Sequence, residues 1–291
     1  MSIEHQRWRA GGVGARVGVR VLIALGALAL GTASRASPPK LVTAPLTDLS
    51  MIEEISKFRS GAGHDFSYDA TFPFGATDAT EPASSMKHYL APWAAHSGDR
   101  STVPVYAPFA GEITRVTNET NGSITNKRIE IQSSTNAAFV LVLFHIDLDE
   151  DYPQIWNDWP AALWPAHQPN DTTYVTRTVS AGDLLGYADM RAAHDFDVAV
   201  LWTDIDGARY WLSYYDLVPD ALFTAYEQRG IAHARLSISK AQRVATPITW
   251  WGGRNEDDWV SVAASAPVPR WTFVAAGVGL LCLAYRRRAM A

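Results

Sequence analysis

Alternating apolar and polar residues in the middle of the chain predict antiparallel β-strands. Residues 112–117 and 127–132 alternate on either side of Asn121-Gly122, a dipeptide that is typical of tight hairpin turns. Residues 139–144 (Phe-Val-Leu-Val-Leu-Phe) are continuously apolar, as expected for a strand that is buried on both faces. The pattern therefore predicts a sheet with residues 139–144 near its centre.

A second hairpin and one helix are predicted further along the chain. Residues 197–202 and 208–212 are strand-like and flank Asp206-Gly207, which favours a tight turn. The segment 219–230 starts with proline and ends with glycine, the order that is typical of an α-helix and its termination. We therefore expect a mainly β fold, with an antiparallel sheet-rich core, loop insertions and a short helical C-terminal appendix.

Both ends of the chain have the patterns of targeting segments. Residues 1–36 contain arginines, an apolar run and then small residues up to Ala36, which predicts a secretory signal peptide. Residues 270–291 contain an apolar stretch and then Arg286-Arg287-Arg288, which predicts a transmembrane anchor with its arginines on the cytoplasmic side. The order Val-Pro, apolar helix and arginine cluster also resembles a PEP-CTERM-type bacterial sorting tail. Both alternatives place the body outside the cytoplasm, in the periplasm or at the cell surface.

The residues between these ends suit one medium-sized domain. We expect the following division: 37–57 as a linker, 58–215 as the sheet-rich domain, 216–260 as a helical or irregular appendix, and 261–269 as a second linker.

Charge and cysteine content exclude several classes of site. Residues 1–36 and 270–291 together carry nine arginines and one glutamate, so without them the formal charge changes from −5 to −13. A body this acidic argues against a nucleic-acid partner, because binding to phosphates needs basic patches. The single cysteine, Cys282, lies in the tail, which excludes an intramolecular disulfide and a cysteine-based zinc site.

Two segments resemble the start of a lysostaphin-type (LytM-like) zinc metallopeptidase domain, which has the duplicated hybrid motif fold. Residues 60–66 (Ser-Gly-Ala-Gly-His-Asp-Phe) match the family's H-x-G-x-D motif at Gly63 and Asp65, but Gly61 stands where the family has its first histidine. Residues 105–111 (Val-Tyr-Ala-Pro-Phe-Ala-Gly) resemble the V-x-A-P-x-x-G strand that follows. Enzymes of this family cut peptidoglycan cross-bridges.

Later segments continue the resemblance in the same order. Residues 144–146 (Phe-His-Ile) resemble the family's Y-x-H-L strand end, and residues 179–186 resemble the glycine turn that precedes its H-x-H strand. The H-x-H motif then falls on Asp195-Phe196-Asp197, so aspartate replaces both histidines. In the family, zinc is held by the histidine and aspartate of the first motif and by the second histidine of H-x-H.

The resemblance implies an altered site. Asp65 and Asp197 stand at metal-ligand positions, and His64 is a further candidate ligand. His145 and Asp195 stand at the catalytic positions, which in the family orient water and stabilise the oxyanion. Loss of two imidazoles shifts a zinc site toward oxygen-preferring cations. We therefore expect either one divalent metal, zinc or a harder cation, or no metal at all.

Two functions remain as alternatives at this stage. The first is a non-catalytic envelope-binding or regulatory module whose partner is peptidoglycan or an envelope peptide or protein. The second is a metal-dependent endopeptidase that acts on peptidoglycan or envelope peptides through an aspartate-rich site. His88 is a candidate nitrogen ligand at the margin of such a site. The tryptophan-rich segment 155–165 suits a glycan groove, although aromatic loops also pack onto their own domain.

Overall fold

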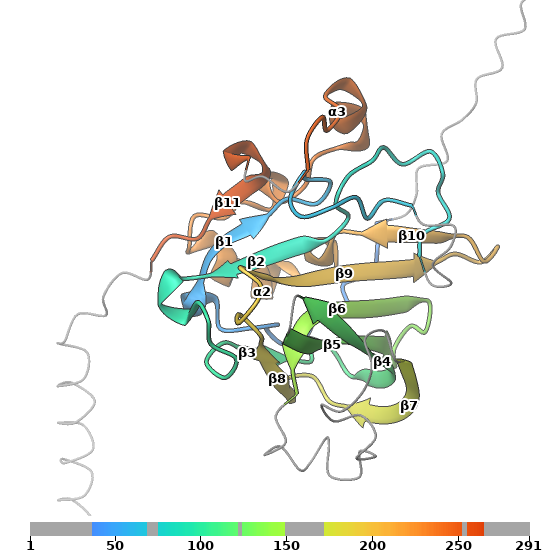
Figure 1. Ribbon diagram of the computed structural model, residues 1–291. Coiled ribbons are helices and arrows are strands. Elements are labelled where there is room, and N and C mark those ends of the chain that lie inside the picture. Colours follow the sequence, from blue (N-terminus) through green and yellow to red (C-terminus); the bar gives the residue numbers. More distant parts are fainter. Residues whose placement is uncertain (1–36, 69–74, 122–123, 149–171, 252–254, 265–291) are drawn as a thin grey trace, which may run out of the picture. The chain divides into compact units, whose positions relative to one another are not determined.

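The computed structural model describes residues 37–68, 75–121, 124–148, 172–251 and 255–264 (Figure 1). The predicted signal peptide, the C-terminal tail and the tryptophan-rich segment lie outside these residues. None of the helices in the described ranges has the length and apolar character that a membrane span requires.

Antiparallel pairing joins the strands of the described residues into one eleven-stranded sheet, which confirms the predicted mainly β fold. The order along the sheet is β11-β1-β2-β9-β6-β5-β4-β7, while β10 pairs with β9, and β8 pairs with both β6 and β3 (Figure 1). The strands are β1 (Ile52–Ser56), β2 (His88–Pro92), β3 (Pro104–Tyr106), β4 (Gly111–Asn121), β5 (Ile124–Ser133), β6 (Phe139–Asp147), β7 (Thr172–Val179), β8 (Leu184–Ala188), β9 (Phe196–Thr203), β10 (Arg209–Leu212) and β11 (Trp259–Ser261).

The helical elements are short and lie mostly after the last hairpin. The described helices are η1 (Leu49–Met51), η2 (Ala94–His96), η4 (Tyr214–Leu217), α2 (Asp220–Glu227), η5 (His233–Arg235), α3 (Lys240–Ala245) and η6 (Glu256–Asp258). Pro219 is the N-cap of α2, and Gly230 adopts a φ of +77° after its end, so the predicted helix is confirmed. In α3, the Ser239 hydroxyl accepts from the Gln242 amide and the Gln242 side chain accepts from the Ser239 amide, which satisfies two otherwise unpaired donors.

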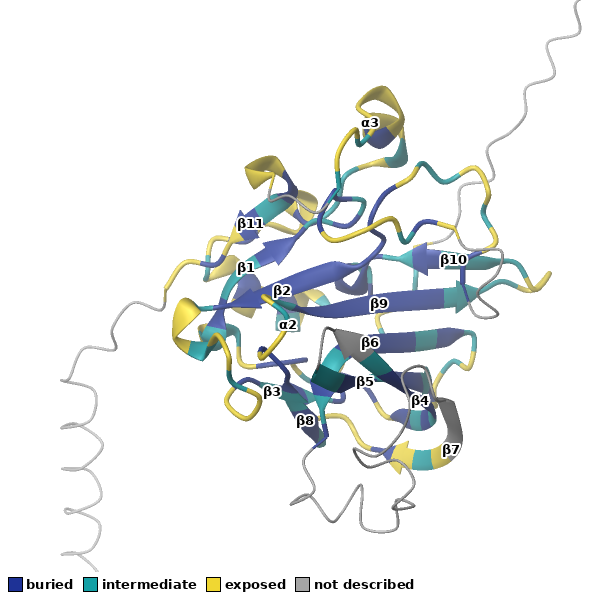
Figure 2. Cartoon of the chain, in the orientation of Figure 1, coloured by how far each residue is buried: buried dark blue, intermediate teal, exposed yellow. Residues whose placement is uncertain are grey.

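The sheet carries apolar clusters on both faces. Leu141 and Leu143 of β6 belong to the larger cluster, whereas Val142 and Phe144 alternate with them and belong to the smaller one. Side chains alternate between the faces of a strand, so β6 is buried on both sides, as its continuous apolar run predicts. Figure 2 shows β2, β6 and β9 buried along most of their length, while α3 is largely exposed.

The segment 37–57, which the sequence suggested as a linker, instead belongs to the domain. β1 lies between β2 and β11 in the sheet, and Leu46, Ile52 and Ile55 are fully buried. The last residues of the expected appendix enter the same sheet as β11. A short strand such as β1 is hard to predict because its pairing partners lie about forty and two hundred residues further along the chain.

Candidate functional site

The strand register brings a row of aromatic and charged side chains to one side of the sheet. Tyr89 of β2 lies opposite Asp197 of β9, and Asp197 lies opposite Phe144 of β6. Directly opposed residues in antiparallel strands project to the same face. We call this side, defined by Tyr89, Asp197 and Phe144, the site face.

Lys87 places a buried positive charge in the middle of this row. Its side chain is 3% exposed, and its Nζ lies 2.9 Å from Asp197 Oδ2. The same Nζ lies 3.9 Å from the ring centroid of Phe144 and 4.5 Å from that of Phe66. Aromatic faces attract cations, so the ammonium is held by one carboxylate and two rings.

The environment of Lys87 keeps it protonated. Burial by itself lowers the pKa of a lysine, because it disfavours the charged form. Here the carboxylate of Asp197, with smaller contributions from Tyr89 and Glu119, outweighs burial and raises the pKa of Lys87 above its usual value. The ammonium is therefore a permanent cation of the site face.

His64, in the segment between β1 and β2, lies close to this ammonium. Its Nδ1 lies 2.9 Å from the carbonyl oxygen of Asp65, and because a carbonyl only accepts, Nδ1 carries the hydrogen. Nε2 is then an acceptor, and it lies 3.4 Å from Lys87 Nζ. Burial and the charge of Lys87 lower the pKa of His64, so the ring is neutral at pH 7.

Asp195 lies two residues before Asp197 and has a different protonation state. Burial, followed by the negative charge of Asp197, raises the pKa of Asp195 to about 8, and Lys87 only partly opposes this rise. Asp195 is therefore a neutral acid at pH 7, whereas Asp197 is paired with an ammonium. The second oxygen of Asp197, Oδ1, is buried and has no hydrogen-bond partner among the described residues.

A second charged group lies further along the site face, on β4 and β5. Arg128 is 3.5 Å from Glu119 and 3.7 Å from Glu130, and Arg115 also bonds Glu130. Burial raises the pKa of Glu119, while the charges of Arg128, His145 and Lys87 oppose the rise. Sequence reasoning missed this group, although its residues occupy the polar positions of the predicted alternating strands.

His145 is placed by an irregularity in β6. Lys127 pairs with Ile146 and Ile129 pairs with Leu143, so Arg128 alone faces two residues, which is a β-bulge. His145 is one of those two residues and adopts a φ of 58°. Its Nδ1 lies 3.1 Å from Asn126 Nδ2, and its charge acts on Glu119. The structure therefore places His145 beside the second charged group.

Asp65 is engaged in holding its own loop. Its Oδ1 accepts from the amide and the hydroxyl of Ser67, at 3.0 and 2.7 Å, and from the amide of Ser84 at 3.2 Å. Among the contacts of the described residues, none joins Asp65 directly to Asp197. The link between the two residues is indirect. The backbone carbonyl of Asp65 contacts His64, His64 contacts Lys87, and Lys87 pairs with Asp197.

The C-terminal appendix packs against Gly61, the residue that the predicted resemblance aligns with the family's first histidine. The Gly61 amide donates to Asp258 Oδ2 at 2.8 Å. A Cβ at Gly61 would lie 3.0 Å from the same oxygen and 3.6 Å from Ile248. Asp258 also pairs with Arg243 at 3.1 Å, which holds its carboxylate in place. A side chain at this position would therefore have to displace the Asp258 carboxylate.

The donor set does not fit a metal ion. Zinc ligands lie about 2.0–2.2 Å from the metal, so an ion shared by His64 and Asp197 would need the space between them. The Lys87 ammonium already contacts both of these groups. Within the described ranges, no three histidine, cysteine, aspartate or glutamate side chains are grouped so that they could hold a metal.

His88 is placed away from the site face. It pairs with Val198, so it projects to the face opposite Tyr89. Its Nδ1 donates to the Ser56 carbonyl at 2.8 Å, and its Nε2 accepts from the Ser213 hydroxyl at 2.9 Å. Burial lowers the pKa of His88 to about 4. The suggestion that it supplies a nitrogen to the site is therefore wrong, because it is a neutral, hydrogen-bonded core residue.

Comparison of the chain with protein-family models, with curated proteins and with solved structures finds no match. The resemblance to lysostaphin-type domains therefore rests on the sequence motifs, and it is carried forward as a proposal. The roles of Asp65, Asp197, His64, His145 and Asp195 likewise stay predictions.

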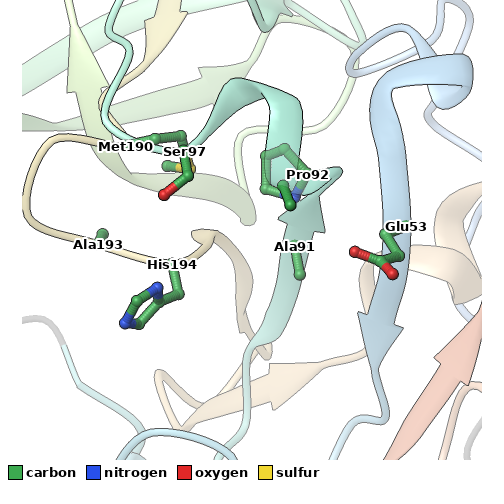
Figure 3. A pocket seen from close by; sticks show the side chains of 8 residues that line it. Glu53, Ala91, Pro92, Ser97, Met190, Ala193 and His194 are labelled. Carbon is green, nitrogen blue, oxygen red and sulfur yellow. The ribbon is translucent and has the colours of Figure 1, made fainter.

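A pocket of about 210 Å³ is lined by His194, the residue before Asp195, and by residues of β1 and β2 (Figure 3). Ala91 lies two residues after Tyr89 on β2 and therefore on the same face. Glu53 of β1 and His194 of the loop before β9 supply polar groups to the pocket, together with the Ser97 hydroxyl (Figure 3). Its remaining lining residues are Pro92, Ala94, Met190 and Ala193.

Proposed function

We propose that this chain is an exported cell-envelope protein whose domain is a degenerate LytM-like peptidase that binds its ligand without cutting it. The observation that carries the proposal is the Lys87 ammonium between Asp197 and His64. It provides the positive charge that a metal provides in an active enzyme.

The chemistry of a lysine ammonium differs from that of a metal. A catalytic zinc lowers the pKa of a bound water and polarises a carbonyl group. An ammonium has no coordination position for water, and here its hydrogens point to a carboxylate, a histidine nitrogen and aromatic rings. The arrangement therefore supports a stable buried ion pair and not a hydrolytic centre.

A peptide of the envelope is the ligand that best suits the pocket beside Asp195, which Glu53 and His194 line. Asp195 is a partly exposed neutral acid that can donate, and His194 and Ser97 add polar groups in the adjoining pocket. Glu53 in the adjoining pocket offers a carboxylate for an amino group. Peptide N–H groups and amines match these acceptors, whereas the acidic body disfavours anionic wall polymers.

The proposal is tested on the purified full-length chain by metal analysis, cross-bridge cleavage and binding to peptidoglycan. We expect no stoichiometric metal, no cleavage and saturable binding that Lys87→Met weakens at least tenfold. Lys40→Met removes an exposed lysine that contacts only the Asp216 carbonyl, and it serves as the matched control. Circular dichroism shows whether Lys87→Met remains folded.

The second candidate function is a metal-dependent endopeptidase. It is favoured by His145, which stands where the resembling motif has its oxyanion-stabilising histidine. This alternative predicts stoichiometric metal in the wild type and cleavage that His145→Ala abolishes. Those two results together would overturn the binding proposal. Saturable binding without metal or cleavage would exclude the enzyme.

A further inference from the structure

An apolar pocket lies on the side of the larger hydrophobic cluster, between the segment before β1 and helix α2. Its volume is about 500 Å³, which is within the range of about 300–1,000 Å³ that is typical of small-molecule sites. Its walls include Val42, Ala44, Tyr106, Val218, Leu222 and Tyr226. Val42, Val218 and Tyr226 belong to the cluster that also contains Leu141 and Leu143, so the pocket is separate from the site face.

Tyr214 also lines this pocket and carries an unsatisfied polar group. Its side chain is 1% exposed, and its hydroxyl is buried without a hydrogen-bond partner among the described residues. Leaving a buried hydroxyl unpaired is costly, so native structures usually supply a partner. Burial, with a contribution from Tyr226, raises the pKa of Tyr214 well above its usual value, so the group keeps its proton and can donate it.

Of the other polar side chains that line the pocket, Thr47 and Asp48 are already engaged, while Tyr106 and Tyr226 add two hydroxyl groups. The Thr47 hydroxyl donates to the Pro104 carbonyl at 2.7 Å, and Asp48 Oδ1 accepts from the Ser50 amide at 2.8 Å. The pocket contains no lysine, arginine or histidine. An anionic ligand would therefore find no opposite charge on the pocket wall, and the one carboxylate, Asp48, is exposed and already accepts a hydrogen bond, which favours a neutral ligand.

We propose that this pocket binds a small neutral apolar molecule that carries one hydrogen-bond acceptor, such as a carbonyl group, which accepts from the Tyr214 hydroxyl. The apolar walls account for the affinity, and the unpaired Tyr214 hydroxyl accounts for the preference between ligands. This inference is independent of the function proposed for the site face.

The test uses two probes of equal size, 2-acetylnaphthalene and 2-ethylnaphthalene, which differ in one carbonyl oxygen. With the full-length chain, we expect the ketone to bind about 3–10-fold more tightly than the hydrocarbon, the value of one net hydrogen bond. Tyr214→Phe should make the two affinities equal. Tyr215→Phe is the matched control, because the Tyr215 hydroxyl is also buried without a partner among the described residues but does not line the pocket.

A second variant locates the binding without altering the core. Ala225 lines the pocket from an exposed position of α2, so Ala225→Phe fills the pocket with little effect on folding. We expect it to weaken both probes at least tenfold. The proposal is overturned if the wild type binds neither probe saturably, if Tyr214→Phe keeps the preference for the ketone, or if Ala225→Phe binds as the wild type does.

Discussion

At the scale of single residues, Lys87 decides the character of the site face. A buried lysine is rare because desolvation disfavours its charge, and it is retained here because Asp197 pairs with it at 2.9 Å. Residues that carry opposite charges in one buried pair do not act independently. The effect of removing one of them depends on whether the other remains.

We predict that Lys87→Met destabilises the protein by about 3–5 kcal/mol, because it leaves the Asp197 carboxylate buried and unpaired. The double variant Lys87→Met/Asp197→Leu should recover a large part of this loss, since it removes both charges. Urea unfolding of the two single variants and the double variant at pH 7 measures the coupling. Additive effects, with no recovery in the double variant, would show that the pair is not a unit.

The raised pKa of Asp195 predicts how the stability of the protein depends on pH. Its pKa is about 8 in the folded protein, against a usual value of 3.8. Between these two values the folded state binds more protons than the unfolded state, so stability is lost as pH rises from about 4 to about 8. Asp195→Asn keeps a neutral side chain and should therefore stabilise the protein more at pH 9 than at pH 5. Urea unfolding at both pH values checks this, and an equal effect at both would contradict the assigned pKa.

At the scale of elements, the C-terminal appendix closes the position that a metal site would need. The residue before β11, Asp258, binds the Gly61 amide and Arg243, and β11 then pairs with β1. The appendix is therefore part of the domain and shapes the loop that carries His64 and Asp65. Its packing explains why a glycine stands at position 61.

We predict that Gly61→His neither restores a metal ligand nor is tolerated. Its Cβ would lie 3.0 Å from Asp258 Oδ2, so the appendix must shift, which should cost about 1–3 kcal/mol or more. Thermal unfolding with and without zinc measures both effects. Ala95→His, at an exposed position of η2, is the control for a histidine without crowding. Stabilisation of Gly61→His by zinc, absent in Ala95→His, would show that the metal site can be rebuilt.

At the scale of the whole molecule, the sheet separates two regions of different chemistry. One face carries charged side chains that are mostly paired, around Lys87 and Arg128. The other side carries the larger apolar cluster and the pocket beside α2. The two candidate binding regions thus occupy different sides of one sheet and can be altered independently.

We predict that the stability of the whole domain does not depend on a metal. The Lys87 ammonium supplies the charge that pairs with Asp197, so removing divalent ions leaves that pair intact. The midpoint of thermal unfolding of the full-length chain should be unchanged by a chelator and by added zinc. A fall of several degrees in chelator, restored by one equivalent of a divalent metal, would require a metal site that contributes to folding.

The sequence by itself determined the elements whose signals are local. The alternation around Asn121, the apolar run 139–144, the turn at Gly207 and the proline and glycine at the ends of α2 each depend on a few neighbouring residues. These features fixed the antiparallel, mainly β class. The resemblance to lysostaphin-type domains, which stays a prediction, also aligns Gly61, Asp195 and Asp197 with histidines of the family.

Only the tertiary structure decided which residues surround these positions. Lys87 meets Asp197 across 110 positions, and Asp258 reaches Gly61 across 197, through contacts that no local pattern encodes. Burial then set the protonation of Asp195 and left the Tyr214 hydroxyl without a partner among the described residues. Charges, pKa values and pockets depend on which residues exclude water from one another, and strand register and packing determine that exclusion.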